Sequence, residues 1–263
     1  MKITIIGGGN MGGAIAVGTA AGGRIAPDGI TVTAKTEKTL EKIRCADARI
    51  RTTTDNREAV RGADLIVVAV KPWLAEEVIA SFRALLDYRR QAVASVVAGL
   101  SFDRLEAMLD NGSGIPPAMF RIIPNTAVSL GESVTFIAAR GASEALLAEV
   151  VSLFDELGRT FVVEEAMMAA GTSLASCGIA FALKYLDAAI RGGQALGFDE
   201  KEARRIVMQT MQGALSLLER NGTMPRTEID KVTTPGGLTL KGLDAMNEKG
   251  FDEAVFAGLD RSR

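Results

Sequence analysis

The sequence predicts an α/β protein in which a mainly parallel, doubly wound N-terminal sheet is followed by an all-helical C-terminal part. Three observations support this. Short apolar runs rich in β-branched residues alternate with segments of helical periodicity up to about residue 162. A glycine cluster directly follows the first of these runs. Beyond residue 163 no strand pattern recurs, so we predict two domains, 1–162 and 163–263.

The strands are predicted from runs of apolar residues. The run at 64–70 is apolar at nearly every position, which is typical of a parallel strand buried on both faces, and the run at 92–98 repeats it. The other strands are predicted at 2–6, 30–34, 119–123 and 133–138. Their alternation with helices favours a mainly parallel sheet with right-handed crossovers.

Helices are predicted between the strands and throughout the second domain. In the first domain they fall at 10–21, 36–44, 74–87, 102–110 and 144–157. The region 166–220 is helical in pattern, and Asp199 with Glu202 three residues later resembles a capping box. Two shorter helices are predicted at 236–248 and 251–260.

The composition excludes several classes of function. A net charge of −2 and a 5% aromatic content give no footprint for nucleic acid. The 263 residues include no histidine, which excludes Ser-His and Cys-His machinery, and we expect no metal site. Cys45 and Cys177 are too far apart in the sequence to suggest a disulfide framework. We therefore expect a reducing, cytoplasmic location, and Met1-Lys2 lead into a strand without a signal peptide.

One apolar stretch, 166–183, is about as long as the shortest membrane spans. It is rich in small residues and closed by Glu165 and Lys184. We interpret it as a buried helix of a soluble protein. It would suit burial against a second copy of the chain, so at least a homodimer is expected and no membrane partner.

Gly7, Gly9 and Gly12 match G-x-G-x-x-G between a predicted strand and a predicted helix. The first glycine permits a sharp turn, the second lets a pyrophosphate approach, and the third lets the helix pack on the strand. Amide groups at the helix start then face the phosphates, so Asn10 and Met11 join the cofactor-binding candidates. This is the signature of a Rossmann-type dinucleotide domain; a glycine-rich turn without a ligand is the alternative.

The end of the second strand indicates which dinucleotide is bound. NAD enzymes commonly place an acidic residue there to bind the ribose diol. Here the strand ends in Thr33-Ala34-Lys35-Thr36, and a cation with hydroxyl groups suits a 2′-phosphate. We predict NADP(H), held by Lys35 and Thr36, with NAD(H) as the alternative if Glu37 accepts from the ribose.

A further motif, Val70-Lys71-Pro72, comes at the end of the strand at 64–70, at the edge where such sheets bind ligands. These three residues complete the set of cofactor-binding candidates that the patterns give.

A second glycine-rich segment lies at 232–243, VTTPGGLTLKGL. Thr234 is a good N-cap and Pro235 a good first-turn residue, so Gly236 and Gly237 would expose amide groups at a helix start. Such a start can bind a small carboxylate, with the Thr239 hydroxyl nearby. The alternative is a capped helix without a ligand.

Several segments together resemble the pyrroline-5-carboxylate reductase family, in the family's order. They are GGGNMGGAI at 7–15, VKP at 70–72, SVVAGL at 95–100, IPNT at 123–126, QTMQGALSLL at 209–218 and VTTPGGLTLKGL at 232–243. The resemblance implies a Rossmann-type domain, a C-terminal helical dimerisation domain, and an active site between the cofactor of one chain and helices of its partner. It implies hydride transfer from NAD(P)H to the ring C=N of 1-pyrroline-5-carboxylate, giving proline.

The resemblance also assigns residues. Thr234, Gly236 and Gly237 would hold the substrate carboxylate, and Thr239 would hydrogen-bond the ring nitrogen. The residues lining the cofactor cleft would be Asn56, Lys71, Ala98, Gly99 and Asn125. We take Thr239 and Lys71 as the catalytic candidates. A cyclic imine is basic enough to be protonated near neutral pH, so the missing histidine is no obstacle, and the protein has mainly to position the reactants.

The sequence departs from the family at 172–181, where TSLASCGIAF replaces TALSGSGPAY, and at 124–127, where PNTA replaces PNTP. These changes leave two alternatives open. One is a related reductase of another small imine, keto or β-hydroxy acid. The other is a regulatory protein that binds NADP(H) without turnover.

Overall fold

The computed structural model describes residues 1–263, which divide into two compact units, Met1–Ser176 and Cys177–Arg263. The chain passes from one to the other within helix. A four-residue helix, α7 (Met168–Gly171), continues through a π-helical segment, Thr172–Cys177, into α8 (Gly178–Ala195). The observed division after Ser176 falls inside this helical run. The domain boundary predicted at 162/163 stays a prediction.

The first unit is built on one eight-stranded sheet of order β3-β2-β1-β4-β5-β6-β7-β8. Every neighbouring pair is parallel except β6 and β7. The strands are β1 (Ile3–Ile6), β2 (Ile30–Thr33), β3 (Arg51–Thr53), β4 (Leu65–Val68), β5 (Ala92–Ser95), β6 (Ala118–Ile123), β7 (Ser133–Arg140) and β8 (Gly158–Val162). The first six strands have the order of a dinucleotide-binding sheet, which confirms the predicted fold class. Sequence patterns do not predict β3 and β8, which are edge strands with few buried side chains.

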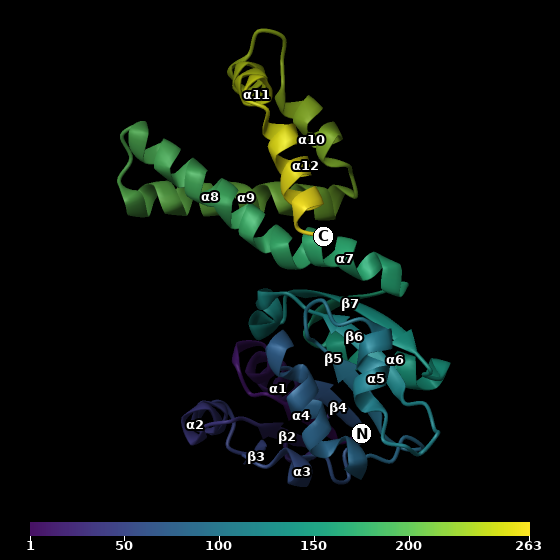
Figure 1. Ribbon diagram of the computed structural model, residues 1–263. Coiled ribbons are helices and arrows are strands. Elements are labelled where there is room, and N and C mark those ends of the chain that lie inside the picture. Colours follow the sequence, from purple (N-terminus) through teal and green to yellow (C-terminus); the bar gives the residue numbers. More distant parts are fainter. The chain divides into compact units, whose positions relative to one another are not determined.

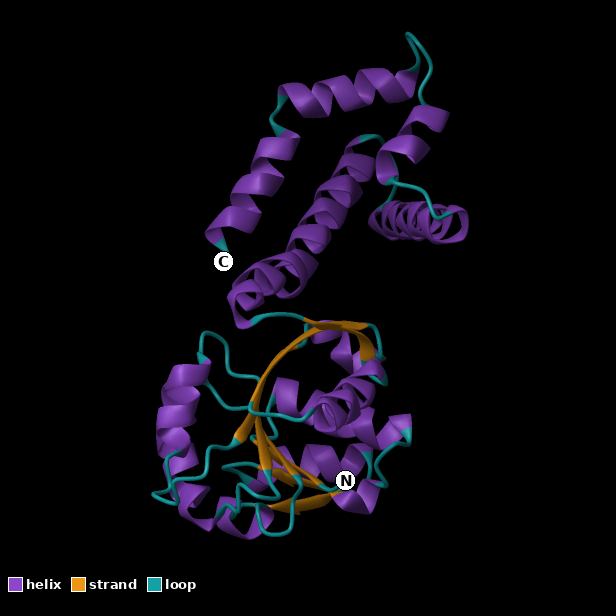
Figure 2. Ribbon diagram, turned by 90° about the vertical axis from the view of Figure 1, so that its right-hand side faces the viewer, coloured by secondary structure: helices purple, strands orange, loops and turns teal.

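Helices cover both faces of this sheet (Figure 2). One apolar core joins the sheet to α1, α2 and α6, and a second core joins it to α3, α4 and α5. Alternation along the strands divides their side chains between the cores: Leu65 and Val67 face the first, and Ile66 and Val68 the second. These helices are α1 (Asn10–Gly22), α2 (Glu37–Ala46), α3 (Asn56–Ala59), α4 (Ala75–Phe82), α5 (Phe102–Leu109) and α6 (Glu144–Asp155).

Short 3-10 segments complete the first unit, at Pro27–Gly29, Pro72–Leu74, Arg83–Leu85, Thr126–Leu130 and Glu165–Met167. Several of them lie where the sequence predicts a longer element. The helix predicted at 74–87, for example, is α4 followed by the 3-10 turn Arg83–Leu85.

The second unit consists only of helices, as predicted (Figure 1). They are α8, α9 (Glu200–Asn221), α10 (Pro225–Val232), α11 (Leu238–Glu248) and α12 (Phe251–Arg261). The Asp199 side chain caps α9 by accepting from the Glu202 amide at 2.9 Å, which confirms the N-terminal half of the predicted capping box. The sequence patterns do not predict α10, which begins at Pro225 as its first helical residue.

The prediction that the apolar stretch at 166–183 is buried is wrong for the single chain. The helical run Glu165–Ala195 is long and apolar enough to cross a membrane by length and composition, and only 17% of its most apolar window is buried. Leu174 and Leu183, for example, are 65% and 58% exposed. Apolar periodicity predicts that a face is covered, but it does not say whether the same chain covers it.

Candidate active site

The glycine loop Gly7–Gly12 connects β1 to α1 with no room for side chains at two positions. A Cβ on Gly7, whose φ is +110°, would lie 2.6 Å from the Ala69 carbonyl oxygen. A Cβ on Gly12 would lie 2.0 Å from the Gly7 carbonyl oxygen. These glycines therefore let the backbone turn and let the helix approach the strand, as the motif requires.

The start of α1 is free to hold an anion. Gly9 is its N-cap residue, and no side chain accepts from the first amides of the helix. A Cβ on Gly9 would meet nothing within 4 Å, so the backbone here faces open space. Asn10 is exposed, Met11 is half-buried, and no acidic side chain occupies the first turn. Free amides and the positive end of a helix dipole fit a pyrophosphate.

The residues after β2 carry positive charge and hydroxyl groups. Lys35 and Thr36 are exposed, and Lys35 has no ion-pair partner. Glu37, the alternative ribose acceptor, is bound instead by Arg44, with 2.5 Å between the Arg44 Nη2 and Glu37 Oε1 atoms. Arg44 also donates to Thr52 at 2.9 Å. At this end of the sheet the Lys35 ammonium group is therefore free, and the Glu37 carboxylate is already paired with Arg44. Both features fit binding of a 2′-phosphate.

The carboxyl ends of β4, β5 and β6 lie along the same sheet edge as the glycine loop, because these strands are parallel to β1. Val70 is half-buried, and Lys71 and Pro72 are exposed where the 3-10 turn Pro72–Leu74 begins. Ala98 and Gly99, the latter with a φ of +73°, are exposed in the loop after β5. In a sheet of this order these strand ends carry the nicotinamide half of a dinucleotide.

Asn56 and Asn125 have structural contacts of their own. Asn56 is the half-buried first residue of α3, and the preceding Asp55 caps that helix. Asn125 is 6% exposed, accepts from the Ala127 amide at 3.1 Å, and donates its own amide to Ser133 Oγ at 3.2 Å. Its side chain therefore shapes the loop after β6, and direct contact of either asparagine with a cofactor stays a prediction.

A cavity of about 660 Å³ runs from the glycine loop along the outer side of α1. Gly9 and Asn10 line its beginning, Thr39 and Lys42 of α2 line one side, and Leu130 lines the other. The predicted phosphate-binding turn thus opens into a groove in the first unit.

The predicted helix start at Thr234 is wrong by three residues. Thr234-Pro235-Gly236-Gly237 forms a turn, in which the Gly237 amide donates to the Thr234 carbonyl at 2.9 Å and Gly236 has a φ of +74°. Proline followed by a residue of positive φ is the pattern of a type II turn, and that φ cannot continue a helix. The N-cap residue of α11 is therefore Gly237, and not Thr234.

A helix start with free amide groups, which the predicted carboxylate site requires, is nevertheless present, three residues later at Gly237. The Gly237 N-cap has no side-chain hydrogen bond, and the first turn of α11 contains no acidic residue. Thr239 is exposed in that first turn. A Cβ on Gly237 would lie 2.6 Å from the Thr234 hydroxyl and 3.0 Å from the Thr234 carbonyl oxygen, so a side chain here would crowd the turn. The free amides and the hydroxyl face solvent at one helix start.

The turn is reached through α10, which is tied to the end of α9. The carboxylate of Glu228 accepts from Lys231 at 2.8 Å, from Thr223, and from Asn221 at 3.2 Å. These hydrogen bonds, first that of Lys231, lower the pKa of Glu228 to about 2. Glu228 is therefore a carboxylate at neutral pH that holds the helix preceding the turn.

Comparison with known proteins assigns the chain. A family model described as pyrroline-5-carboxylate reductase dimerisation matches residues 165–263, and one described as NADP oxidoreductase, coenzyme F420-dependent, matches residues 2–99. Pyrroline-5-carboxylate reductase of Aquifex aeolicus is 33% identical over 100% of this chain and 95% of its own length. The chain belongs to the pyrroline-5-carboxylate reductase family.

One further relative supports membership of the pyrroline-5-carboxylate reductase family, and one solved structure supports the fold. Pyrroline-5-carboxylate reductase 1 of Dictyostelium discoideum is 32% identical over 98% of this chain, which spans only 48% of that longer protein. A crystal structure of pyrroline carboxylate reductase from Plasmodium falciparum, with NADP bound, superposes with a TM-score of 0.88 at 23% identity. That match covers 100% of this chain and 95% of the other. The fold class and the family predicted from the sequence are thereby confirmed.

Three residues make contacts near the candidate site that sequence patterns do not predict. Arg44 donates to the Glu37 carboxylate, Glu165 accepts from Phe102 at the start of α5 and from Arg121 on β6, and Ser176 donates to the Pro124 carbonyl at 3.2 Å. The partners of Glu165 and Ser176 are distant in the sequence, whereas Arg44 and Glu37 lie seven positions apart in the same helix, α2, outside the usual pair spacing of three or four. For Ser176 one signal exists: it falls in the stretch 172–181 that departs from the family pattern.

Proposed function

We propose that this protein reduces 1-pyrroline-5-carboxylate to proline with NADPH. The observation that carries the proposal is the pair of uncapped helix starts, α1 and α11, each preceded by a glycine turn, in a chain of the pyrroline-5-carboxylate reductase family. One suits the phosphates of a dinucleotide, and the other suits a small carboxylate.

The first unit holds the cofactor in this proposal. The amides at the start of α1, in the loop Gly7–Gly12, bind the pyrophosphate, and Lys35 with Thr36 binds the 2′-phosphate. Bound NADPH supplies a hydride to the ring imine carbon of the substrate. Lys71 remains a catalytic candidate, because its unpaired ammonium group lies at the edge that carries the nicotinamide half.

The start of α11 holds the substrate. Amides after Gly237 and the turn at Thr234 and Gly236 bind the carboxylate, so the ring is presented in one orientation. The Thr239 hydroxyl accepts from the protonated ring nitrogen, whose positive charge draws the hydride to the neighbouring carbon. Because the nitrogen already carries its proton, no histidine is required, and positioning supplies roughly 7–11 kcal/mol of the barrier reduction.

We propose a homodimer, or a larger homo-oligomer, formed in the cytoplasm through the C-terminal helices. Within Cys177–Arg263 only Ala203 is buried, whereas Leu183, Leu196 and Leu238 are 58%, 83% and 86% exposed. Helices with so much exposed apolar surface indicate that another protein surface covers them. The match of residues 165–263 to a dimerisation model supports a second copy of this chain as that surface.

A second candidate function is reduction of another small imine or keto acid. The observation that favours it is the change from TALSGSGPAY to TSLASCGIAF at 172–181, where the chain is π-helical over Thr172–Cys177. Altered side chains at that segment would change which ring fits.

The test is a reductase assay on the purified protein. NADPH oxidation is followed with 1-pyrroline-5-carboxylate, with the six-membered analogue 1-piperideine-carboxylate, and with a small keto acid, each repeated with NADH. We expect the highest kcat/KM with the five-membered imine and NADPH. Turnover of the other compounds alone would establish the second candidate. Binding of NADPH without oxidation in a single-turnover experiment would establish a regulatory protein.

A further inference from the structure

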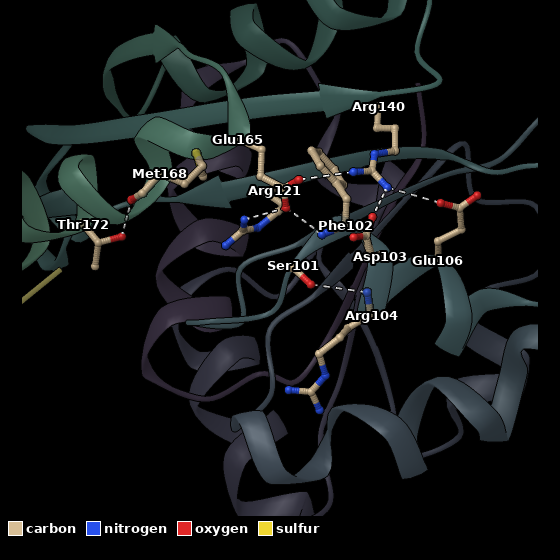
Figure 3. A network of polar contacts seen from close by, with 10 residues as sticks. All are labelled: Ser101, Phe102, Asp103, Arg104, Glu106, Arg121, Arg140, Glu165, Met168 and Thr172. Atoms are coloured by element: carbon tan, nitrogen blue, oxygen red, sulfur yellow. Dashed lines mark hydrogen bonds and ion pairs between the residues drawn. The ribbon is translucent and has the colours of Figure 1, made fainter.

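Glu165 is at the centre of a polar network on the side of the sheet that carries α5 (Figure 3). Its Oε1 atom accepts from the Phe102 backbone amide at 2.7 Å and from Arg121 Nη1 at 2.8 Å. Its Oε2 atom accepts from Arg140 Nη2 at 3.3 Å. One carboxylate therefore binds two strands, β6 and β7, and the start of one helix, α5.

Two of these donors adjoin the loops that we assign to the nicotinamide half of the cofactor cleft. Phe102 is the first residue of α5, directly after the loop that contains Ala98 and Gly99. Arg121 lies on β6, which leads into the loop at Pro124 and Asn125. The loops come from adjacent strands, β5 and β6, and the Glu165 carboxylate is hydrogen-bonded to the element beside each of them.

The contacts are strong and partly shielded from water. The side chains of Arg121 and Glu165 are 12% and 30% exposed, so the pair is screened less than a surface ion pair. A carboxylate at the first amide of a helix is further stabilised by the helix dipole. Ser176 holds the same β6 loop a second time by donating to the Pro124 carbonyl at 3.2 Å.

We propose that Glu165 is a positioning residue that fixes the loops after β5 and β6 as the floor for the nicotinamide. The proposal rests on the proposed function only in taking NADPH as the cofactor of the first unit. The adenosine half of a dinucleotide lies over β1 and β2, on elements that Glu165 does not contact. Loss of the carboxylate should therefore affect one half of the cofactor and spare the other.

Glu165→Ala tests this with two ligands. Binding of adenosine 2′,5′-bisphosphate, which contains only the adenosine half of NADPH, should be unchanged. Binding of NADPH should weaken by about tenfold, as for a lost charged hydrogen bond. Hydride transfer in a single turnover should fall by roughly 10- to 100-fold, because a misplacement of about 1 Å costs on that order. A merely structural residue would weaken both ligands alike.

Asp103→Asn is the matched control. Asp103 binds Arg140 in the same network at 2.6 Å, but its side chain is 85% exposed and it accepts from neither the Phe102 amide nor Arg121. This variant should bind both ligands and transfer hydride as the wild type does. Glu165→Gln keeps an acceptor oxygen and loses the charge. It should show the same pattern as Glu165→Ala with a smaller effect. If the alanine variant does not fold, the glutamine variant tests the proposal in its place.

Two results would overturn the proposal. One is equal weakening of NADPH and adenosine 2′,5′-bisphosphate in the Glu165 variants. The other is a Glu165 variant that cannot be told apart from Asp103→Asn in NADPH binding and hydride transfer. If the wild type binds NADPH but does not reduce the five-membered imine, the proposed substrate fails, while the comparison of the two ligands still tests Glu165.

Discussion

At the scale of single residues, we expect different side chains to bind the substrate and the cofactor. Thr239 is in the first turn of α11 and has no partner in the single chain that would hold its hydroxyl for another purpose. Lys35 and Thr36 are equally exposed after β2. Substitution at these two places should therefore have different kinetic consequences.

Thr239→Ala should lower kcat for 1-pyrroline-5-carboxylate by roughly 10- to 100-fold, the cost of one hydrogen bond to a charged group. The dissociation constant of NADPH, measured by fluorescence titration, should not change, because the proposed role of this hydroxyl is to bind the substrate alone. Thr227→Ala, on an exposed position of α10, is the control and should retain full activity. A parallel loss of NADPH affinity would show that Thr239 has another role.

Arg44→Ala should shift cofactor preference towards NADH. In the wild type Arg44 binds Glu37, and removal of the guanidinium frees that carboxylate to accept from a ribose diol and to repel a 2′-phosphate. The kcat/KM ratio of NADPH to NADH should fall by about fivefold, since a partly exposed ion pair is worth about 1 kcal/mol or less. Arg49→Ala, which removes an exposed pair with Asp47, should leave the ratio unchanged.

At the scale of elements, turns and helix ends determine the site more than helix interiors do. The π-helical segment Thr172–Cys177 coincides with the part of the chain that departs from its family, and it is where Ser176 reaches the Pro124 carbonyl. π-helical turns are rare and often occur at functional sites. The end of α5 is held in a comparable way, by Tyr88, whose hydroxyl donates to the Leu109 carbonyl.

Tyr88 gives the first unit a specific dependence on alkaline pH. Burial raises the pKa of Tyr88 to about 12, whereas an unfolded tyrosine titrates near pH 10. Its contribution to stability is therefore complete below about pH 10 and is lost as the pH rises towards 12, by about 2–3 kcal/mol at most. Urea unfolding should show this loss for the wild type but not for Tyr88→Phe, relative to the value of each at pH 9. Identical pH profiles would contradict it.

At the scale of the whole molecule, the two units differ in how they are stabilised. The sheet unit has two apolar cores, whereas in Cys177–Arg263 only Ala203 is buried. A set of helices without a core of its own is not stable alone, because burial of apolar surface is the main favourable term in folding. The second unit is therefore expected to depend on another copy of the chain.

Leu183→Glu should dissociate the oligomer. Leu183 is 58% exposed on α8, and a carboxylate placed between two copies would be desolvated without a partner. Light scattering should show a smaller particle, with loss of helical circular dichroism as the second unit loosens. Leu85→Glu, at an exposed leucine of the sheet unit, is the control and should leave the particle mass unchanged. A monomeric wild type would exclude the proposed oligomer.

The sequence could predict features that depend on neighbours along the chain. Strand runs such as 64–70, the glycine turn at Gly7–Gly12 and the cap at Asp199 are local, so they were predictable, and with them the fold class. The short edge strand β3 and the helix α10 lack a strong apolar period and were not predictable. At Thr234 two local signals compete, and the Pro-Gly turn prevails over the threonine cap because Gly236 adopts a positive φ.

The sequence by itself determined the dinucleotide fold, the first glycine turn and the family, because backbone conformation and apolar periodicity follow from residues close together in the chain. Only the tertiary structure decided that Glu165 joins the start of α5 to β6, that Ser176 reaches the Pro124 carbonyl, and that the helical run from 165 is exposed. Glu165, for instance, lies 63 positions from Phe102 and 44 from Arg121. Contacts over such separations depend on how the sheet is assembled, and local patterns contain no information about it.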